Sequence, residues 1–338
     1  MVVQLTASAD QARARAFVEA QGLGWEAGCQ DLVGAFEDGA LVAAGGRDGD
    51  VLKMIAIDED HRSGSLLGEL VGELVRLGAA VGHDGFFVYT RPSSAGSFEA
   101  LNFRLLASHG QATLLESGGR FQAWLEHQLR QRRTGPGGAV VVNCNPFTLG
   151  HQWLIEQAAA RLPTLYAFVV REDRSAFPFE DRLRMVREVT RHLPNVAVLD
   201  TGRYAVSAVT FPAYFLAKGA PLEAIQLELD VALFGGRIAP PFGVTHRFFG
   251  TEPGCATTRA YNEALRRVLP SFGVTPVELP RQEAHGAYIS ASSVRDALAR
   301  DDLPAVARLV PPSTLDYLRS PGGRAIASRL AAGRGSNR

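Results

Sequence analysis

The chain has 338 residues, of which 46% are hydrophobic and 21% are charged, a balance typical of a folded globular protein. At about 150 residues per domain this length indicates about two domains, and the composition excludes a collagen-like fibre, a largely disordered chain and a disulfide scaffold. Lys plus Arg and Asp plus Glu are 35 each, so charge gives no reason to expect nonspecific binding to nucleic acid or to an anionic membrane.

Membrane insertion and secretion are not indicated by the sequence. No apolar run approaches the ~20 residues that span a bilayer, and the N-terminus lacks the basic, apolar and small-residue regions of a signal peptide. The three cysteines, Cys29, Cys144 and Cys255, are odd in number and far apart, which argues against a disulfide framework and a CxxC metal site. We therefore expect a cytoplasmic protein.

The first part of the chain predicts an α+β domain. Asp10 can N-cap a helix that runs to Ala20. Asp-Gly pairs at 38–39 and 48–49 predict two hairpins, because glycine tolerates positive φ. The other expected elements are strands at 32–36, 41–44, 51–57, 86–90 and 112–115, and helices at 66–75 and 97–107.

Residues 132–138, which read Arg-Arg-Thr-Gly-Pro-Gly-Gly, form the clearest internal boundary. Glycine and proline at this density cannot continue the preceding helix-like stretch, so a linker is expected here. The sequence therefore predicts a first domain over 1–132 and a second over 139–330, followed by a fraying tail.

Strands and helices alternate in the second part, which implies a parallel sheet with helices on both faces. Ligands of such sheets bind beyond the carboxyl ends of the strands. We therefore expect the loops after 143 and after 250 and the turn at 289 to converge on one site. The expected strands are 139–143, 164–170, 196–199, 246–250 and 275–279; the expected helices are 151–161, 179–192, segments across 207–232, 255–269 and a region from 291.

Two segments in this part carry residues suited to anion binding. The first, at 142–151, reads Val-Asn-Cys-Asn-Pro-Phe-Thr-Leu-Gly-His and joins a strand to a helix. Gly150 allows a phosphate to approach the backbone, the amides of the first helical turn favour an anion, and His151 then projects beside it. The alternative is an ordinary loop with a capping histidine.

The second segment, at 289–295, reads Ile-Ser-Ala-Ser-Ser-Val-Arg and opens another helix. Ser290 or Ser292 can cap this helix, and the hydroxyls together with Arg295 form a second anion cradle. Taken alone, the segment indicates an N-cap with a solvated arginine.

Together the two segments resemble the paired signatures of the nucleotidylyltransferase superfamily, Thr-x-Gly-His and Ile-Ser-x-Ser-x-x-Arg. Longer sequence motifs lie at 143–151, 177–182, 243–248, 250–253, 261–262 and 289–295. These motifs resemble those of one family in particular, citrate lyase ligase. In that family the preceding domain resembles a GNAT acetyltransferase. The resemblance implies an N-terminal GNAT-like α+β domain followed by a Rossmann-like, HIGH-type nucleotidyltransferase domain with a parallel sheet.

The resemblance also implies a reaction. ATP and acetate would give acetyl-adenylate and pyrophosphate, and the acetyl group would pass to the thiol of the phosphoribosyl-dephospho-coenzyme A group on the acyl-carrier subunit of citrate lyase. Two other functions stay open: adenylyl transfer to a phosphate ester in cofactor biosynthesis, and a catalytically silent binding subunit. The intact signatures argue against the silent subunit.

Site residues follow from the same resemblance. Thr148 and His151 would hold α- and β-phosphate oxygens, Arg295 would hold the β- and γ-phosphates with the serines, and Mg²⁺ would neutralise the remaining charge. These three residues are the expected catalytic ones, and no protein ligand is assigned to a metal. The residues expected to bind ATP are Asn143, Asn145, Pro146, Phe147, Gly150, Gly250, Glu252, Ile289, Ser290 and Ser292.

Three features leave alternatives open. Cys144 is either a nucleophile beside the histidine or a small buried packing residue, and the adenylate route needs no enzyme thiolate. Phe177-Pro178-Phe179 is either a lid over the nucleotide or an entry into the core. The turn at 61–66, His-Arg-Ser-Gly-Ser-Leu, departs from the GNAT pyrophosphate loop because Leu66 replaces a small residue, so a structural or docking role is favoured over acetyl-CoA binding.

Overall fold

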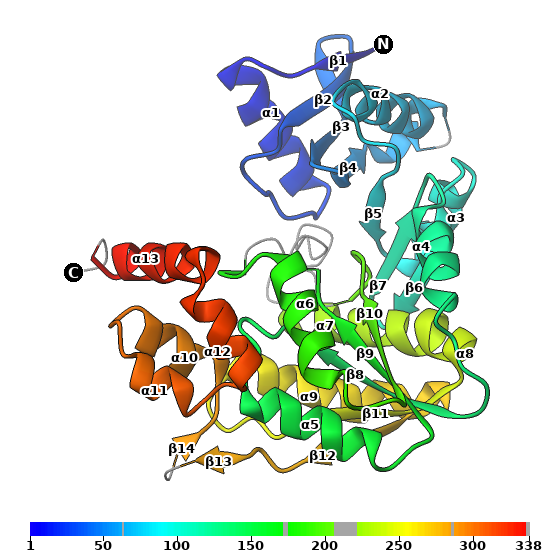
Figure 1. Ribbon diagram of the computed structural model, residues 1–338. Coiled ribbons are helices and arrows are strands. Elements are labelled where there is room, and N and C mark those ends of the chain that lie inside the picture. The colour runs from blue at the N-terminus through cyan, green and yellow to red at the C-terminus, as the bar shows by residue number, and fades with distance from the viewer. Residues whose placement is uncertain (63, 172–174, 206–221, 285–286, 336–338) are drawn as a thin grey trace. The chain divides into compact units, whose positions relative to one another are not determined.

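The computed structural model describes residues 1–62, 64–171, 175–205, 222–284 and 287–335 (Figure 1). They divide into two compact units, Met1–Trp124 with Ala208–Leu233, and Leu125–Ser207 with Phe234–Arg338. This division differs from the expected domains 1–132 and 139–330. The first unit ends inside helix α4 (Arg120–Leu129), and it includes a later stretch of chain with helix α7 (Leu222–Leu233). The rest of the helical segments expected at 207–232 lies outside the described residues.

The first unit is an α+β domain, as expected, built on a seven-stranded sheet of order β1-β2-β3-β4-β5-β7-β6. Neighbouring strands are antiparallel except β4 and β5, which are parallel and are connected by α2. Helix α7 packs on β6 and β7. The elements are β1 (Val2–Gln4), α1 (Ser8–Ala20), β2 (Asp31–Glu37), β3 (Ala40–Asp48), β4 (Val51–Ile57), α2 (Leu66–Ala80), β5 (Phe87–Thr90), α3 (Ala95–Glu99), β6 (Arg104–His109) and β7 (Ala112–Glu116).

Local expectations in this unit are confirmed at the hairpins and wrong at two helix ends. Asp38 and Gly39 both adopt positive φ, at 50° and 81°, in the turn between β2 and β3. Asp10 does not cap α1, because the helix begins earlier and its N-cap is Ala7. The helix expected over 97–107 stops at Glu99, because Asn102 adopts a left-handed φ of 63° that ends the helix before β6.

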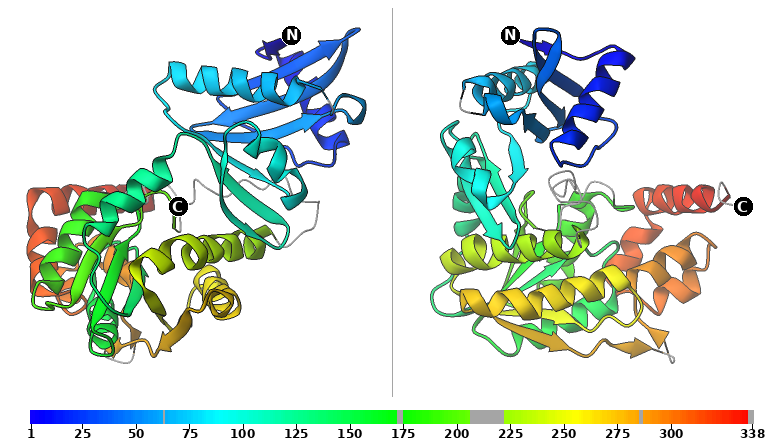
Figure 2. Two further views of the ribbon diagram at one scale, coloured as in Figure 1. Left: turned by 90° about the vertical axis from the view of Figure 1, so that its right-hand side faces the viewer. Right: turned by 180° about the vertical axis from the view of Figure 1, so that it is seen from behind.

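The second unit holds a five-stranded parallel sheet of order β10-β9-β8-β11-β12, which confirms the expected class (Figures 1 and 2). The chain adds β9 and β10 on one side of β8, and β11 and β12 on the other. The elements are β8 (Gly137–Val142), α5 (Leu149–Ala159), β9 (Thr164–Val169), α6 (Phe179–Thr190), β10 (Val196–Asp200), α8 (Ala239–Phe242), β11 (Val244–Gly250), α9 (Ala256–Val268), β12 (Thr275–Leu279), β13 (Glu283–Ala284), β14 (Ala287–Tyr288), α10 (Ala291–Leu298), α11 (Leu303–Ala307), α12 (Pro312–Arg319) and α13 (Pro321–Gly335).

The strand order reverses between β8 and β11, and this reversal positions the site. In a parallel sheet such a reversal opens a crevice at the carboxyl ends of the two strands, where ligands bind. Among the helices that the structure describes, none has the length and apolar character needed to cross a lipid bilayer.

The expected linker is shorter than its glycines suggested, because Gly137 and Gly138 already belong to β8. A Cβ on Gly137 would lie 2.9 Å from a ring carbon of Tyr166, and one on Gly138 would lie 2.7 Å from a methyl carbon of Leu162. These two glycines therefore allow close packing at the start of the strand, and the linker prediction was wrong for them.

The apolar segment that leads into α6 belongs to the core of the second unit. Phe177 is fully buried and Phe179 is 7% exposed, and both pack in the cluster formed by the sheet and its helices. Of the two alternatives for this segment, the structure supports entry into the core.

Candidate active site

A cavity of about 300 Å³ lies beyond the carboxyl ends of β8 and β11, at the reversal of strand order. Its walls come from the loop after β8, the loop after β11 and the segment before α10, so the expected convergence of these three segments is confirmed. The predicted site residues that line it are Asn143, Thr148, Gly150, His151, Gly250, Glu252 and Ile289.

Thr148 and His151 form a reciprocal cap at the start of α5. The Thr148 hydroxyl accepts the His151 N–H at 3.3 Å, and the Thr148 N–H donates to Nδ1 of His151 at 3.0 Å. The Leu149 N–H donates to the Leu309 carbonyl, whereas the Gly150 N–H has no acceptor among the described residues and is available to an anion. The histidine is therefore a capping residue and a cavity residue at once.

The protonation state of His151 follows from its surroundings. Desolvation of the ring, assisted by the charge of Arg281, lowers its pKa to about 4. The ring is therefore neutral near pH 7. Because Nδ1 accepts an amide hydrogen, the proton lies on Nε2, which makes that nitrogen a hydrogen-bond donor.

The two signature segments contact each other at Gly150 and Ile289. A Cβ on Gly150 would lie 3.3 Å from the Ile289 carbonyl oxygen, so glycine permits this close approach. A second link joins residues 150 positions apart, because Nη1 of Arg295 donates to the Asn145 carbonyl. Arg295 also donates from Nη2 to the Ser292 hydroxyl at 3.1 Å.

Six predicted site residues lie beside the cavity without lining it. Ser290 caps α10 by accepting the Ser293 N–H at 3.0 Å, which settles which serine is the cap. Phe147 is fully buried, and its ring centroid is 5.6 Å from that of His151. These six residues are Asn145, Pro146, Phe147, Ser290, Ser292 and Arg295.

Arg182 supports the loop after β8 and had no predicted role. Its side chain is fully buried, and Nη1 donates to the Asn143 carbonyl at 2.9 Å and to the Val170 carbonyl at 2.6 Å. Its Nε donates to the Phe177 carbonyl at 3.0 Å. The sequence motif at 177–182 contains this residue, but nothing local in the sequence distinguishes a buried arginine from a solvated one.

Arg281 is a cavity residue that the sequence did not indicate. Its Nη1 lies 2.5 Å from Oε2 of Glu252, and its Nε donates to the Ile289 carbonyl at 3.2 Å. The other oxygen of Glu252, Oε1, accepts the amides of Gly254 and Cys255. Both carboxylate oxygens are therefore engaged by the protein.

No cysteine is among the described residues that line the cavity. Cys144 is fully buried, and burial raises the pKa of its thiol, which supports the packing role over the nucleophile. The described residues contain no group of three or more His, Cys, Asp or Glu side chains that could hold a metal ion. Glu252 is the only carboxylate among the described residues that line the cavity.

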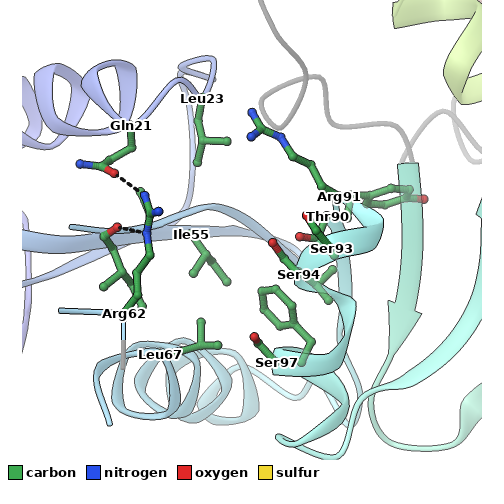
Figure 3. A pocket seen from close by; sticks show the side chains of 15 residues that line it. Gln21, Leu23, Ile55, Arg62, Leu67, Thr90, Arg91, Ser93, Ser94 and Ser97 are labelled. Carbon is green, nitrogen blue, oxygen red and sulfur yellow. Dashed lines mark hydrogen bonds between the residues drawn. The ribbon is translucent and has the colours of Figure 1, made fainter. Parts of the chain in front are cut away.

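A second cavity of about 370 Å³ lies in the first unit between β4 and β5 (Figure 3). The two strands pair only at Val51 with Phe87 and at Leu52 with Val88 in the described ladder, and then separate. Figure 3 shows Arg62 on one side of this cavity, bonded to Gln21. Apolar side chains form its base and hydroxyls its far side, including Ile55, Leu67, Thr90, Ser93, Ser94 and Ser97.

Three amides of the turn that enters α2 beside this cavity are bonded within the turn. The N–H groups of His61, Arg62 and Gly64 donate to the carbonyls of Asp58, Glu59 and His61. A pyrophosphate cradle would need such amides to be open to a ligand.

A parallel sheet with a cavity at its reversal of strand order, bordered by the start of a helix, is typical of α/β proteins that bind phosphorylated ligands. A family model described as the citrate lyase ligase C-terminal domain matches residues 137–318. The citrate pro-3S-lyase ligase of Klebsiella pneumoniae is 38% identical over 89% of this chain and 90% of its own. That of Escherichia coli K12 is 39% identical over 84% of this chain and 83% of its own.

The chain therefore belongs to the citrate lyase ligase family. Among solved structures, the N-acetylglutamate synthase of Neisseria gonorrhoeae is similar to part of it, with 15% identity and a TM-score of 0.29 over 35% of each chain.

Proposed function

We propose that this enzyme activates acetate with ATP to acetyl-adenylate, and that it transfers the acetyl group to the prosthetic-group thiol of the citrate lyase acyl-carrier subunit. Membership of the citrate lyase ligase family over most of the chain is the observation that carries this proposal. The donor groups around the cavity support it. We expect the reaction in the cytoplasm because it consumes ATP.

Two bond exchanges make up the reaction. An acetate oxygen attacks the α-phosphorus, and the bond to the β-phosphate oxygen breaks to release pyrophosphate. The thiolate of the carrier then attacks the carbonyl carbon of the acetyl group, and AMP leaves as the thioester forms. No residue of the enzyme is acylated in this route.

The donors at the start of α5 suit the first step. Negative charge moves onto the phosphate oxygens as pyrophosphate leaves, so fixed donors stabilise the transition state more than the ground state. We assign this role to Nε2 of His151 and to the Gly150 N–H, with Thr148 holding the ring in place. Arg295 would steady the loop through Asn145 or reach the distal phosphates.

The remaining members of the proposed ATP site divide by position. Those that line the cavity would face the nucleotide, and those beside it would shape the loops. The proposed set is Asn143, Asn145, Pro146, Phe147, Gly250, Glu252, Ile289, Ser290 and Ser292.

We expect Mg²⁺ to enter with the phosphates of ATP. The protein supplies no free carboxylate for it at the cavity, since both oxygens of Glu252 are engaged within the described residues. Mg²⁺ commonly keeps several waters and binds through substrate phosphates, which suits this donor set.

Pyrophosphate exchange tests the first step in isolation. Acetate should promote incorporation of labelled pyrophosphate into ATP without any carrier protein, because adenylate formation is reversible. Addition of thiol-form citrate lyase should then release AMP, and alkylation of the prosthetic thiol should block that release while exchange continues. Exchange that depends on a phosphate ester instead of acetate would replace this proposal with cofactor adenylylation, and ADP as product would refute both.

A further inference from the structure

Arg281 is held by two of the loops that build the candidate site. Its N–H donates to the Thr251 hydroxyl at 2.9 Å, and its Nη1 reaches Glu252 on the same loop at 2.5 Å. Its Nε donates to the Ile289 carbonyl, one residue before the cap of α10. The guanidinium is therefore fixed in place before any ligand arrives.

The guanidinium still has a donor to offer. Nη2 bonds to no acceptor in the described part of the protein, whereas Nε and Nη1 are both used. The side chain is 22% exposed and lines the same cavity as Gly150 and His151. Its charge also acts on the imidazole of His151.

The other basic groups near the cavity are uncharged, lie outside its lining, or are buried against an aromatic ring. His151 is neutral near pH 7. Arg295 donates to Asn145 and Ser292 and does not line the cavity. Arg247 lines the cavity, and its guanidinium lies 4.4 Å from the ring centroid of Phe234. An arginine with an open nitrogen next to His151 is thus well suited to a phosphate oxygen beside that histidine.

From this arrangement we propose that Arg281 binds the α-phosphate of the nucleotide, and that Glu252 is the positioning residue that orients it. The inference rests on the proposed function and names a further residue of the same site. Glu252 suits this role because Oε1 is anchored by the amides of Gly254 and Cys255 while Oε2 holds Arg281.

Ligand binding by calorimetry tests the assignment without turnover. Arg281→Ala should weaken binding of AMP and of α,β-methylene-ATP by a similar factor, roughly 10- to 100-fold for one charge-assisted hydrogen bond. Pyrophosphate binding should be unchanged, because it lacks the α-phosphate. Arg266→Ala is the matched control, since Arg266 pairs with Glu278 at 2.5 Å outside the cavity and should leave all three affinities unchanged.

If Arg281 only linked the two loops and did not bind the nucleotide, the three measured affinities would change differently. In that case the binding of all three ligands would weaken together, in proportion to the loss of thermal stability. A folded Arg281→Ala enzyme with normal affinity for AMP would overturn the proposal outright. Should that variant not fold, Glu252→Gln keeps the side-chain shape and should weaken the binding of AMP but not that of pyrophosphate. Ring NMR should also show a higher pKa for His151 in Arg281→Ala, because a nearby positive charge is removed.

These outcomes separate the two proposals. Absence of acetate-dependent exchange in the wild-type enzyme would refute the proposed function while the AMP measurement still tests Arg281. Normal exchange together with normal AMP binding in Arg281→Ala would refute the role of Arg281 alone.

Discussion

The ring of His151 performs two tasks, and one nitrogen serves each. Nδ1 accepts the Thr148 amide and completes the cap of α5, while Nε2 is left as a donor. A sequence reading can indicate either a capping or a phosphate-binding histidine at this position. The tautomer decides which ring nitrogen accepts a hydrogen bond and which donates one, and only the three-dimensional arrangement defines the tautomer.

Replacement of His151 should damage catalysis far more than stability. His151→Ala should lower the turnover of acetate-dependent exchange by roughly 10²–10³-fold, as expected for loss of one charge-stabilising donor. Because Thr148 still caps the helix, the loss of the reciprocal bond should cost about 1 kcal/mol or less. Exchange kinetics and urea unfolding of the same preparation would check both expectations.

The pH dependence of the free energy of unfolding tests whether the His151 ring is neutral in the folded protein. The folded-state pKa of about 4 lies below the ordinary value of 6.5, so between these values the unfolded chain binds the proton and the folded chain does not. The free energy of unfolding should therefore rise with pH across this window and fall as the solution is acidified. In His151→Ala this part of the pH dependence should vanish; an identical profile in both proteins would contradict a neutral buried ring.

At the scale of elements, α6 is joined to the ends of β8 and β9 by one side chain. Arg182 reaches back from the helix to the carbonyls of Asn143 and Val170, and so helps to hold the loop that carries the candidate site. The position of most strands and helices followed from local patterns. This link did not, because its partners are far away in the sequence.

Arg182→Met should destabilise the second unit strongly. The change leaves several buried carbonyl acceptors without their donor, and each unsatisfied group costs about 1–3 kcal/mol. We expect a loss of at least about 3 kcal/mol in the free energy of unfolding, measured in urea. Arg184→Met on the same helix is the control, because that side chain is 64% exposed and should change stability by no more than about 1 kcal/mol. Equal effects of the two changes would show that the buried bonds contribute little.

Where elements were misplaced, the cause is tertiary packing or backbone conformation. Gly137 and Gly138 had the composition of a linker, yet they start a strand at positions where bulky neighbours leave no space for a Cβ. Asn102 interrupts an apolar pattern that would otherwise continue the helix into β6. Composition alone does not distinguish a glycine required for space from a glycine required for flexibility.

At the scale of the whole molecule, the number and class of the domains and the convergence of the three site segments could be predicted. The convergence follows from a rule of the parallel sheet, which ties the ends of strands to the binding crevice. The expectation of two domains came from the chain length and the glycine-rich stretch at 132–138. The place of Arg281 in the site and the return of α7 to the first unit could not be predicted. Each depends on a long-range contact between residues whose local sequence is unremarkable for a solvated helix or loop.

The cavity of the first unit should not serve as an acetyl-CoA site. The amides of His61, Arg62 and Gly64 bond within the turn before α2, and Leu66 packs against the core. Calorimetry should detect no tight binding of acetyl-CoA, and acetyl-CoA should not replace ATP and acetate in the acetylation of citrate lyase. A micromolar dissociation constant that is lost in Gly64→Val would contradict this expectation.

The return of α7 to β6 and β7 has a consequence for the order in which the protein is made. The ribosome completes β6 and β7, and then β8, β9 and β10, before it reaches Leu233. Until then the surface of β6 and β7 that α7 covers stays open to solvent and to other nascent chains. The first unit is therefore completed only after three strands of the second have been made, and a ribosome stalled after β7 leaves the surface of β6 and β7 that α7 covers without its partner helix.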